Sequence, residues 1–183
     1  MRSCLTRADY EEIYRWFDMA TPLVSDCGEL CQKKCCSEWE KGVGMYLYPG
    51  EEVMFDGEED WLTYSRHSTE DYEFCPEWQG ELTFIMCTRP CPRERRPVEC
   101  RSFPLAPHLN DEGELELRLD DDGLHLCPLV QSGDMGLLDP DFVYGVGRAW
   151  DILLRDPLIR ADVRWRSRLR DEGEDEPWKL LLR

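Results

Sequence analysis

Residues 27–36 read CGELCQKKCC, and this stretch alone carries four of the ten cysteines in the 183-residue chain. Cys27, Cys31 and Cys35 recur at every fourth residue, so a helix over this stretch would align their thiols in one stripe. Thiolates in such a stripe repel one another unless a cation neutralises them. The stretch therefore predicts one edge of a metal site.

More cysteines follow in a region that is rich in Pro, Glu and Arg and has few hydrophobic periods, where loops can bend around an ion. One or two free cysteines commonly serve as small buried hydrophobes, and we interpret the isolated Cys4 in this way. Nine cysteines in three groups exceed what burial explains. We predict that the metal ligands come from Cys27, Cys31, Cys35, Cys36, Cys75, Cys87, Cys91, Cys100 and Cys127.

The overall charge limits the classes of partner. The 39 acidic and 22 basic side chains give a formal net charge of -17, which disfavours nucleic acid or an anionic membrane as the main partner. The chain has no apolar run near the roughly 20 residues that a membrane-spanning helix needs. The first twenty residues are too charged for a secretion signal, so we expect a cytoplasmic protein. In that reducing compartment, clustered cysteines favour metal ligation over disulfides.

The hydrophobic pattern predicts helices near both ends of the chain. A helix should start after Thr6 and run to Met19, with Asp9 closing a capping box. Two more helices should begin at Asp139-Pro140 and Asp156-Pro157, because Asp and Pro favour the first turn. Residues 171–183 begin with the acidic run DEGEDE, and we expect them to form a mobile segment.

Between these helices we expect short strands and irregular chain. A strand should precede Pro49-Gly50, with a helix starting at Glu51, and residues 56–100 should be irregular. Residues 114–127 alternate on both sides of DDDG, which predicts an antiparallel hairpin that turns at 120–123. The predicted fold is a small irregular α+β domain over residues 1–170, stapled by metal, with several helices and this hairpin.

Three stretches resemble the YkgJ-type cysteine-cluster family of zinc- or iron-chelating domains. They are CGELCQKKCC at 27–36, MYLYPGEE at 45–52, and RRPVECRSFP at 95–104 with a later Cys127-Pro128. The resemblance spans about residues 23–130, and RPxxCRxFP is its most specific part. It implies metal ligation by Cys27, Cys31, Cys35, Cys36, Cys91, Cys100 and Cys127, with Cys75 and Cys87 as alternatives for the position before Cys91.

All-thiolate ligation suits zinc or iron, including an iron-sulfur cluster. Eight or nine cysteines would fill two four-ligand zinc sites, one bridged zinc cluster or two iron-sulfur clusters. His108 and His125 are open alternatives, either as replacements for a thiolate or as ordinary core or surface histidines, and His67 should be solvated. Arg95, Arg96 and Arg101 could offset thiolate charge or pair with carboxylates.

Three functions remain open from the sequence. The first is a metal-binding cysteine-cluster protein with a structural, metal-handling or electron-transfer role. The second is a metal-dependent or iron-sulfur group-transfer enzyme, since the resemblance extends to flagellin lysine N-methylases. The third is a protein-interaction module whose zinc only shapes a surface, with a protein as its partner. The sequence contains no serine-hydrolase order, phosphate-binding glycine loop or HExxH motif.

Overall fold

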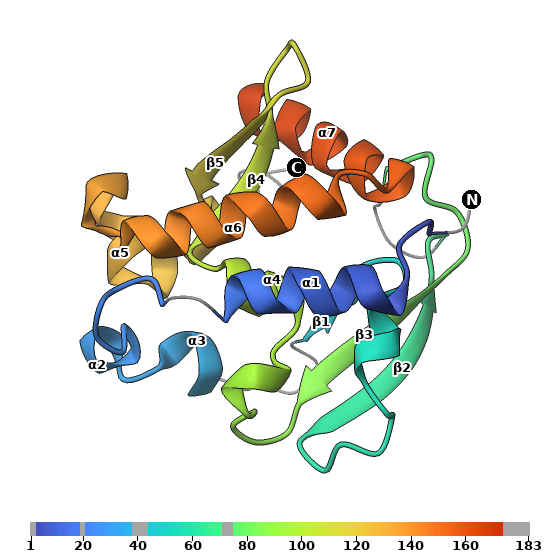
Figure 1. The fold of residues 1–183 in the computed structure, drawn as a ribbon, viewed down its shortest axis with the longest axis horizontal. Helices are drawn as coiled ribbons and strands as arrows, with labels where there is room; N and C mark the ends of the chain where they lie inside the picture. Colours follow the sequence, from blue (N-terminus) through green and yellow to red (C-terminus); the bar gives the residue numbers. More distant parts are fainter. Residues whose placement is uncertain (1–2, 19–20, 38–43, 71–74, 174–183) are drawn as a thin grey trace, which may run out of the picture.

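The computed structural model describes residues 3–18, 21–37, 44–70 and 75–173. Within these residues the fold is α+β, which confirms the predicted class: helices pack with two small antiparallel sheets that lie apart from each other (Figure 1). The α-helices are α1 Arg7–Phe17, α2 Gly28–Cys31, α3 Lys34–Ser37, α4 Val98–Ser102, α5 Pro128–Ser132, α6 Pro140–Leu153 and α7 Pro157–Asp171. The strands are β1 Met45–Tyr46, β2 Leu62–Ser68, β3 Glu81–Cys87, β4 Leu105–Leu109 and β5 Leu115–Leu119. Short 3-10 helices cover Glu51–Met54, Arg93–Arg95, Asp121–His125 and Met135–Leu137.

The three predicted helices form the framework of the molecule. Thr6 and Asp9 make the expected capping box at the start of α1. Asp139 and Asp156 cap α6 and α7, and each is followed by the expected proline. The two long helices α1 and α6 pack against each other, as Figure 1 shows, while α7 packs against β4.

The main core lies between these helices and the β4–β5 sheet. Its fully buried side chains come from all three framework helices, because each helix presents one apolar stripe. They include Tyr10, Ile13, Val146, Trp150, Ile152 and Ile159. A second, smaller core lies on one face of the other sheet and consists of Leu47, Trp61, Leu62 and Ile85. The molecule therefore has two packing centres.

The prediction of an irregular region over residues 56–100 is wrong. Strands β2 and β3 pair antiparallel through seven residues each, and β1 joins the other edge of β3. The sequence of β2, LTYSRHS, does not indicate a strand, because most of its residues are polar. The aromatic and aliphatic residues of β3 supply the apolar surface, and the pairing follows from them.

The predicted hairpin is also wrong in its pairing. Strand β5 pairs with β4, which precedes it, and the turn between them is Asn110–Gly113. The Asn110 side chain accepts a 2.9 Å hydrogen bond from the backbone of Glu114, and Gly113 has φ +79°. The segment DDGLH forms a 3-10 helix in place of a second strand, and Leu124 is 46% exposed. This helix leads directly into Cys127, so the local geometry positions a predicted metal ligand.

Candidate metal centre

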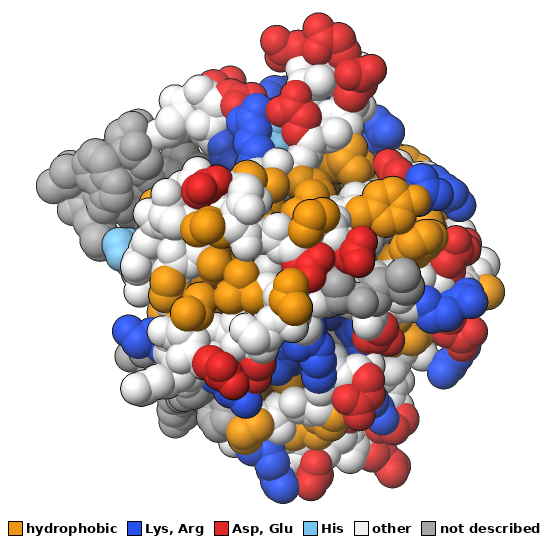
Figure 2. Space-filling model, turned by 60° about the vertical axis from the view of Figure 1, so that its left-hand side comes forward, with side chains coloured by type: hydrophobic (Ala, Val, Ile, Leu, Met, Phe, Trp, Pro, Cys, Tyr) orange, Lys and Arg blue, Asp and Glu red, His pale blue; other side chains and the backbone are white. Residues whose placement is uncertain are grey.

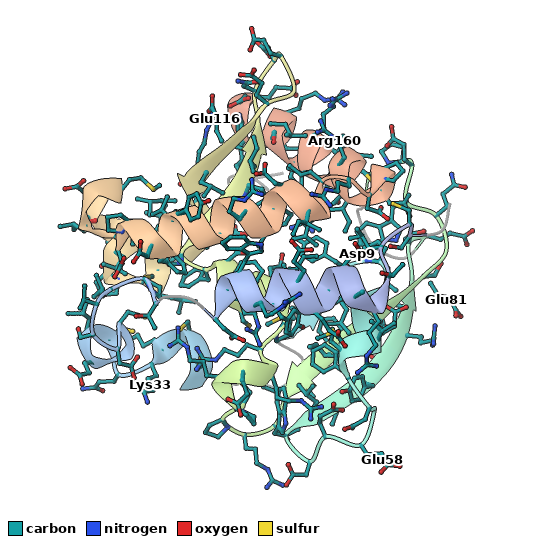
Figure 3. The ribbon with its side chains drawn as sticks, viewed as in Figure 1. Asp9, Lys33, Glu58, Glu81, Glu116 and Arg160 are labelled. Atoms are coloured by element: carbon teal, nitrogen blue, oxygen red, sulfur yellow. The ribbon has the colours of Figure 1, made fainter. Side chains whose placement is uncertain are left out.

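The cysteine-rich stretch 27–36 is not one continuous helix, so the predicted stripe of thiols is wrong. Gln32 and Lys33 both have left-handed backbone conformations, with φ of 56° and 59°, and they separate α2 from α3. The Lys33 side chain, labelled in Figure 3, lies close to Asp26, with Nζ 3.5 Å from Oδ2. Helix α2 therefore ends at Cys31, and α3 begins at Lys34.

One group of thiols gathers around α2 and α5, and we call it the helix group: Cys27, Cys31, Cys35 and Cys127. Burial raises the pKa of Cys27, and the charges of Asp26, Cys127 and Cys31 raise it further. The pKa of Cys35 is raised by its hydrogen bond to Cys36 and by burial, and also by the charges of Cys31 and Cys27. Cys127 belongs to the main core, and Cys27 packs against the same core.

A second group gathers at the end of β3 and along α4, and we call it the sheet group: Cys36, Cys87, Cys91 and Cys100. Burial raises the pKa of Cys87 to about 11, with further contributions from Cys91 and Cys36. Burial also raises the pKa of Cys100, as do the charges of Cys36, Cys87 and Cys91. Cys87 and Cys91 pack against the smaller core, and the sulfur atom of Cys100 contacts Met45, which packs against that core as well.

The two groups meet at Cys35 and Cys36, whose sulfur atoms are 3.9 Å apart. The hydrogen bond from Cys35, together with the charges of Arg96 and Lys33, lowers the pKa of Cys36 to about 6. A lowered pKa favours the thiolate, which is the form that binds metals. All ten cysteines are free thiols.

Cys75 and Cys4 lie apart from both groups. Cys75 is 1% exposed and belongs to the main core, and burial and the nearby charge of Asp162 raise its pKa. Cys4 lies at the other end of the framework, where its backbone N–H donates a 2.7 Å hydrogen bond to Asp156. Of the two alternatives for the position before Cys91, the structure brings Cys87 to the group and leaves Cys75 in the core.

Arg96 is the arginine that faces the thiols. Burial lowers its pKa, but the charge of Cys36 and a hydrogen bond with Cys91 raise it overall. Among the described residues, its buried Nε atom has no hydrogen-bond partner. The Nε atom of Arg95 is buried without a partner in the same part of the chain.

The other two arginines of this segment bind protein groups. Arg95 bonds to Glu59 and Asp56. Arg101 is buried, bonds to Asp18 at 2.6 Å and to the carbonyl oxygens of Arg96 and Glu94, and lies over the Tyr14 ring. These contacts hold the loop before α4 in place, so Arg95 and Arg101 support the position of Cys100 indirectly.

The histidines lie in other environments. His67 is half-buried, stacks on Phe84 and bonds to Tyr46 and Ser65, so the expectation that it is solvated is wrong. His108 is 1% exposed on β4, with Nε2 3.4 Å from an oxygen of Asp171. His125 is exposed.

Two residues near the sheet group were not predicted from the sequence. The sulfur atom of Met45 lies 3.5 Å from that of Cys100. Glu51 is fully buried and accepts hydrogen bonds from the Val98 and Tyr48 backbones and from the Tyr14 hydroxyl, so it fixes the start of α4. The sign of Glu51 in the sequence is the acidic pair that follows Pro49-Gly50 in an otherwise apolar stretch. From the sequence, that pair indicated only the start of a helix.

Within residues 3–18, 21–37, 44–70 and 75–173, no three His, Cys, Asp or Glu side chains are already arranged as a metal-ligand set. No helix in this part of the chain is both long enough and apolar enough to cross a bilayer. On the face drawn in Figure 2, acidic and basic side chains are interspersed among apolar ones. Comparisons of the chain with protein-family models, curated proteins and solved structures found no match.

Proposed function

We propose that this chain is a cytoplasmic metal-binding protein whose clustered thiolates hold zinc or iron, including iron as an iron-sulfur centre. The proposal rests on eight cysteines from four separate parts of the chain, with Cys27 and Cys127 packed against the main core, Cys87 and Cys91 packed against the smaller core, and the sulfur atoms of Cys35 and Cys36 3.9 Å apart. The similarity to the YkgJ-type family in three sequence stretches supports the same function, and we propose a distant relationship on that basis.

The donor set fits such a metal. Burial, and after it neighbouring charges, raise the pKa values of Cys27, Cys87 and Cys100, so their thiolates are costly in the folded chain, and a bound cation would remove that cost. Soft sulfur ligands favour zinc or iron-sulfur centres over magnesium or calcium. Closure of a ligand set requires the exposed or half-buried thiols around α2 and α3 to rotate toward their neighbours, which their exposure permits.

The metal would act first as a cross-link. The helix group joins α2, α3 and the start of α5, and the sheet group joins α3, the end of β3 and α4. Such links stabilise short helices, which have too few internal hydrogen bonds to be stable alone. A bound iron-sulfur centre would add the capacity to carry an electron.

The test is metal analysis of the protein purified without exposure to oxygen. We expect stoichiometric zinc or iron, with visible absorption and colour only if the metal is an iron-sulfur centre. Removal of the metal with a chelator should lower the melting temperature, and adding it back should restore the original value. The Cys4→Ser variant should retain full metal content because Cys4 lies apart from the thiol groups. Protein that contains no metal and does not gain stability from added Zn²⁺ or Fe²⁺ would refute the proposal.

A further inference from the structure

We propose that a small cavity between α4, β4 and α7 binds the ammonium group of a primary alkyl amine, with the Tyr48 hydroxyl and the carboxylates of Glu99 and Asp120 as its hydrogen-bond acceptors. None of the cysteines lines this cavity. The inference therefore goes beyond the proposed metal-binding function, and it holds or fails whether or not the chain binds a metal.

The size of the cavity limits what it can hold. Its volume is about 50 Å³, and its apolar wall consists of the buried side chains of Leu105, Trp150 and Val163. A water molecule occupies about 30 Å³ in the liquid, so the cavity admits a group the size of water or ammonium but not a ring. The exposed Asp122 also lines the cavity, which therefore opens to solvent. A ligand can insert a small polar head and leave its chain at the opening.

The charges around the cavity favour a cation. Its charged lining residues are Glu99, Asp120, Asp122, Arg166 and Arg170. Arg166 is already engaged, because its Nε atom lies 3.0 Å from the fully buried Asp162 and its Nη1 atom 3.5 Å from Glu99. Arg170 donates a 2.9 Å hydrogen bond to the carbonyl oxygen of Pro107. Carboxylates thus outnumber guanidinium groups here, and a cationic head group complements the remaining negative charge.

The titration of two lining carboxyl groups agrees with this charge balance. Burial raises the pKa of Glu99, and the charges of Asp120, Asp162 and Asp122 raise it further against the opposing effect of Arg166. Burial and the charge of Asp122 likewise raise the pKa of Asp120. A positive charge placed among these groups would stabilise their ionised forms.

Tyr48 supplies the independent observation that points to a ligand. It lines the cavity, is only 6% exposed, and packs its ring edge-on against Trp150 with 5.5 Å between the ring centroids. The hydroxyls of Tyr10 and Tyr14 are bonded to Pro49 and Glu51, whereas that of Tyr48 has no hydrogen-bond partner among the described residues. An unpaired buried hydroxyl costs free energy, and a bound donor would remove that cost.

An ammonium group suits these acceptors better than a metal ion. Within the part of the chain that the structure describes, no group of three His, Cys, Asp or Glu side chains could hold a metal. A primary ammonium has three N–H donors, enough for one hydroxyl and two carboxylates. Its N–H···O distances of about 2.9 Å exceed the metal–oxygen distances of about 2.0–2.6 Å, so it can serve acceptors that are spread more widely. The methylene beside the nitrogen would contact the apolar wall.

Isothermal titration calorimetry of the full chain with butylamine tests the site, at neutral pH and at an ionic strength that screens the acidic surface. We expect one saturable site per chain and much weaker binding of tetramethylammonium, which is larger and has no N–H donor. Nα-acetyl-lysine amide distinguishes two sources of the amine: binding tighter than that of butylamine would indicate a protein side chain, and weaker binding a free small molecule. Either result supports the site. No saturable binding of either amine, or equal binding of tetramethylammonium or K⁺, would overturn the inference.

The variant Tyr48→Phe removes the hydroxyl and keeps the ring against Trp150. Its dissociation constant for butylamine should rise about tenfold or more, because a hydrogen bond to a charged group is lost. The melting temperature of the free protein should stay the same or rise, because an unpaired buried hydroxyl is removed. Tyr144→Phe is the matched control, since Tyr144 is 61% exposed on α6 and should bind butylamine like the wild type. Wild-type butylamine binding by Tyr48→Phe would overturn the inference.

The variant Asp120→Asn tests the charge separately from the hydroxyl. Asparagine can still accept the hydrogen bond that the Asp122 backbone donates to Asp120, so the start of the 3-10 helix Asp121–His125 should be kept. We expect weaker butylamine binding without loss of the folded circular dichroism spectrum. Undiminished binding by this variant would show that the carboxylate does not face the amine and would also overturn the inference.

Discussion

A Cβ atom added to Gly145 of α6 would lie only 2.7 Å from the carbonyl oxygen of Trp16 in α1. The two framework helices therefore cross with one backbone almost touching the other. Only glycine permits this approach without displacing a helix, and displacement of α1 would disturb the packing of Ile13 and Val146 in the core.

Gly145→Ala should destabilise the fold. Forced overpacking typically costs about 1–3 kcal/mol, which exceeds the roughly 1 kcal/mol that alanine gains over glycine inside a helix. Gly147→Ala is the control in the same helix, since its nearest neighbour would be Leu117 Cδ1 at an ordinary 3.8 Å. Urea unfolding should show a lower midpoint for the first variant and an equal or higher one for the second. Equal stabilisation by both changes would contradict the close crossing.

Arg101→Lys should lower stability by about 1–3 kcal/mol, because lysine cannot keep several buried acceptors satisfied at once. The side chain of Arg101 is 4% exposed and binds Asp18 as well as two carbonyl oxygens. Arg89→Lys is the matched control: Arg89 pairs with Asp60 in solvent, and such pairs contribute about 0–1 kcal/mol. Thermal unfolding of both variants tests the difference, and a similar small effect in each would argue against a structural role for Arg101.

Glu51 should make the stability depend on pH. Burial raises its folded-state pKa to about 7 from the ordinary 4.5, despite the hydrogen bonds that it accepts. The stability that the neutral carboxyl provides is present below about pH 4.5 and is lost as the pH rises through about 7.

The Glu51→Gln variant should remove this contribution. Its free energy of unfolding should depend less on pH between about pH 5 and about pH 8 than that of the wild type. Glu52, the exposed neighbour in the same 3-10 helix, provides the control, because Glu52→Gln leaves Glu51 in place. Parallel pH dependences for wild type and Glu51→Gln would show that Glu51 does not change its protonation on folding.

The helical part of the fold was predictable because its signals are local. Thr6, Asp139 and Asp156 mark helix starts through bonds within one turn of chain, and all three act as predicted. The sheets were not predictable in the same way. The sequence offers two turns beside β5, DDDG after it and Asn110–Gly113 before it. Strand β5 pairs across the second turn, because its partner β4 is wholly buried. Strand pairing depends on partners that local patterns do not identify.

The candidate site likewise has features that the sequence predicts and features that it does not. The sequence identified the cysteines, but the four-residue spacing suggested a continuous helix that Gln32 and Lys33 interrupt. It also could not separate Cys75 from Cys87, because both precede Cys91 in a stretch without a specific motif of its own. The end of β3 carries Cys87 to the sheet group, while Cys75 enters the core beside Asp162. The three-dimensional path of the chain determines which of the two cysteines joins the sheet group. The spacing of cysteines along the sequence does not reveal that path.

Arg96→Met should accelerate metal loss if the thiols bind a metal. The guanidinium forms a hydrogen bond with Cys91 and interacts with the charge of Cys36. Groups that support metal ligands in this way typically change metal affinity by about 10- to 100-fold when removed. Arg95→Met is the matched control, because Arg95 binds Glu59 and Asp56 instead. Transfer of zinc to a coloured chelator, measured by absorbance, should be faster for Arg96→Met and unchanged for Arg95→Met. If both variants release metal at the wild-type rate, Arg96 does not stabilise the bound state, and the sheet group must balance its thiolate charge through the metal alone.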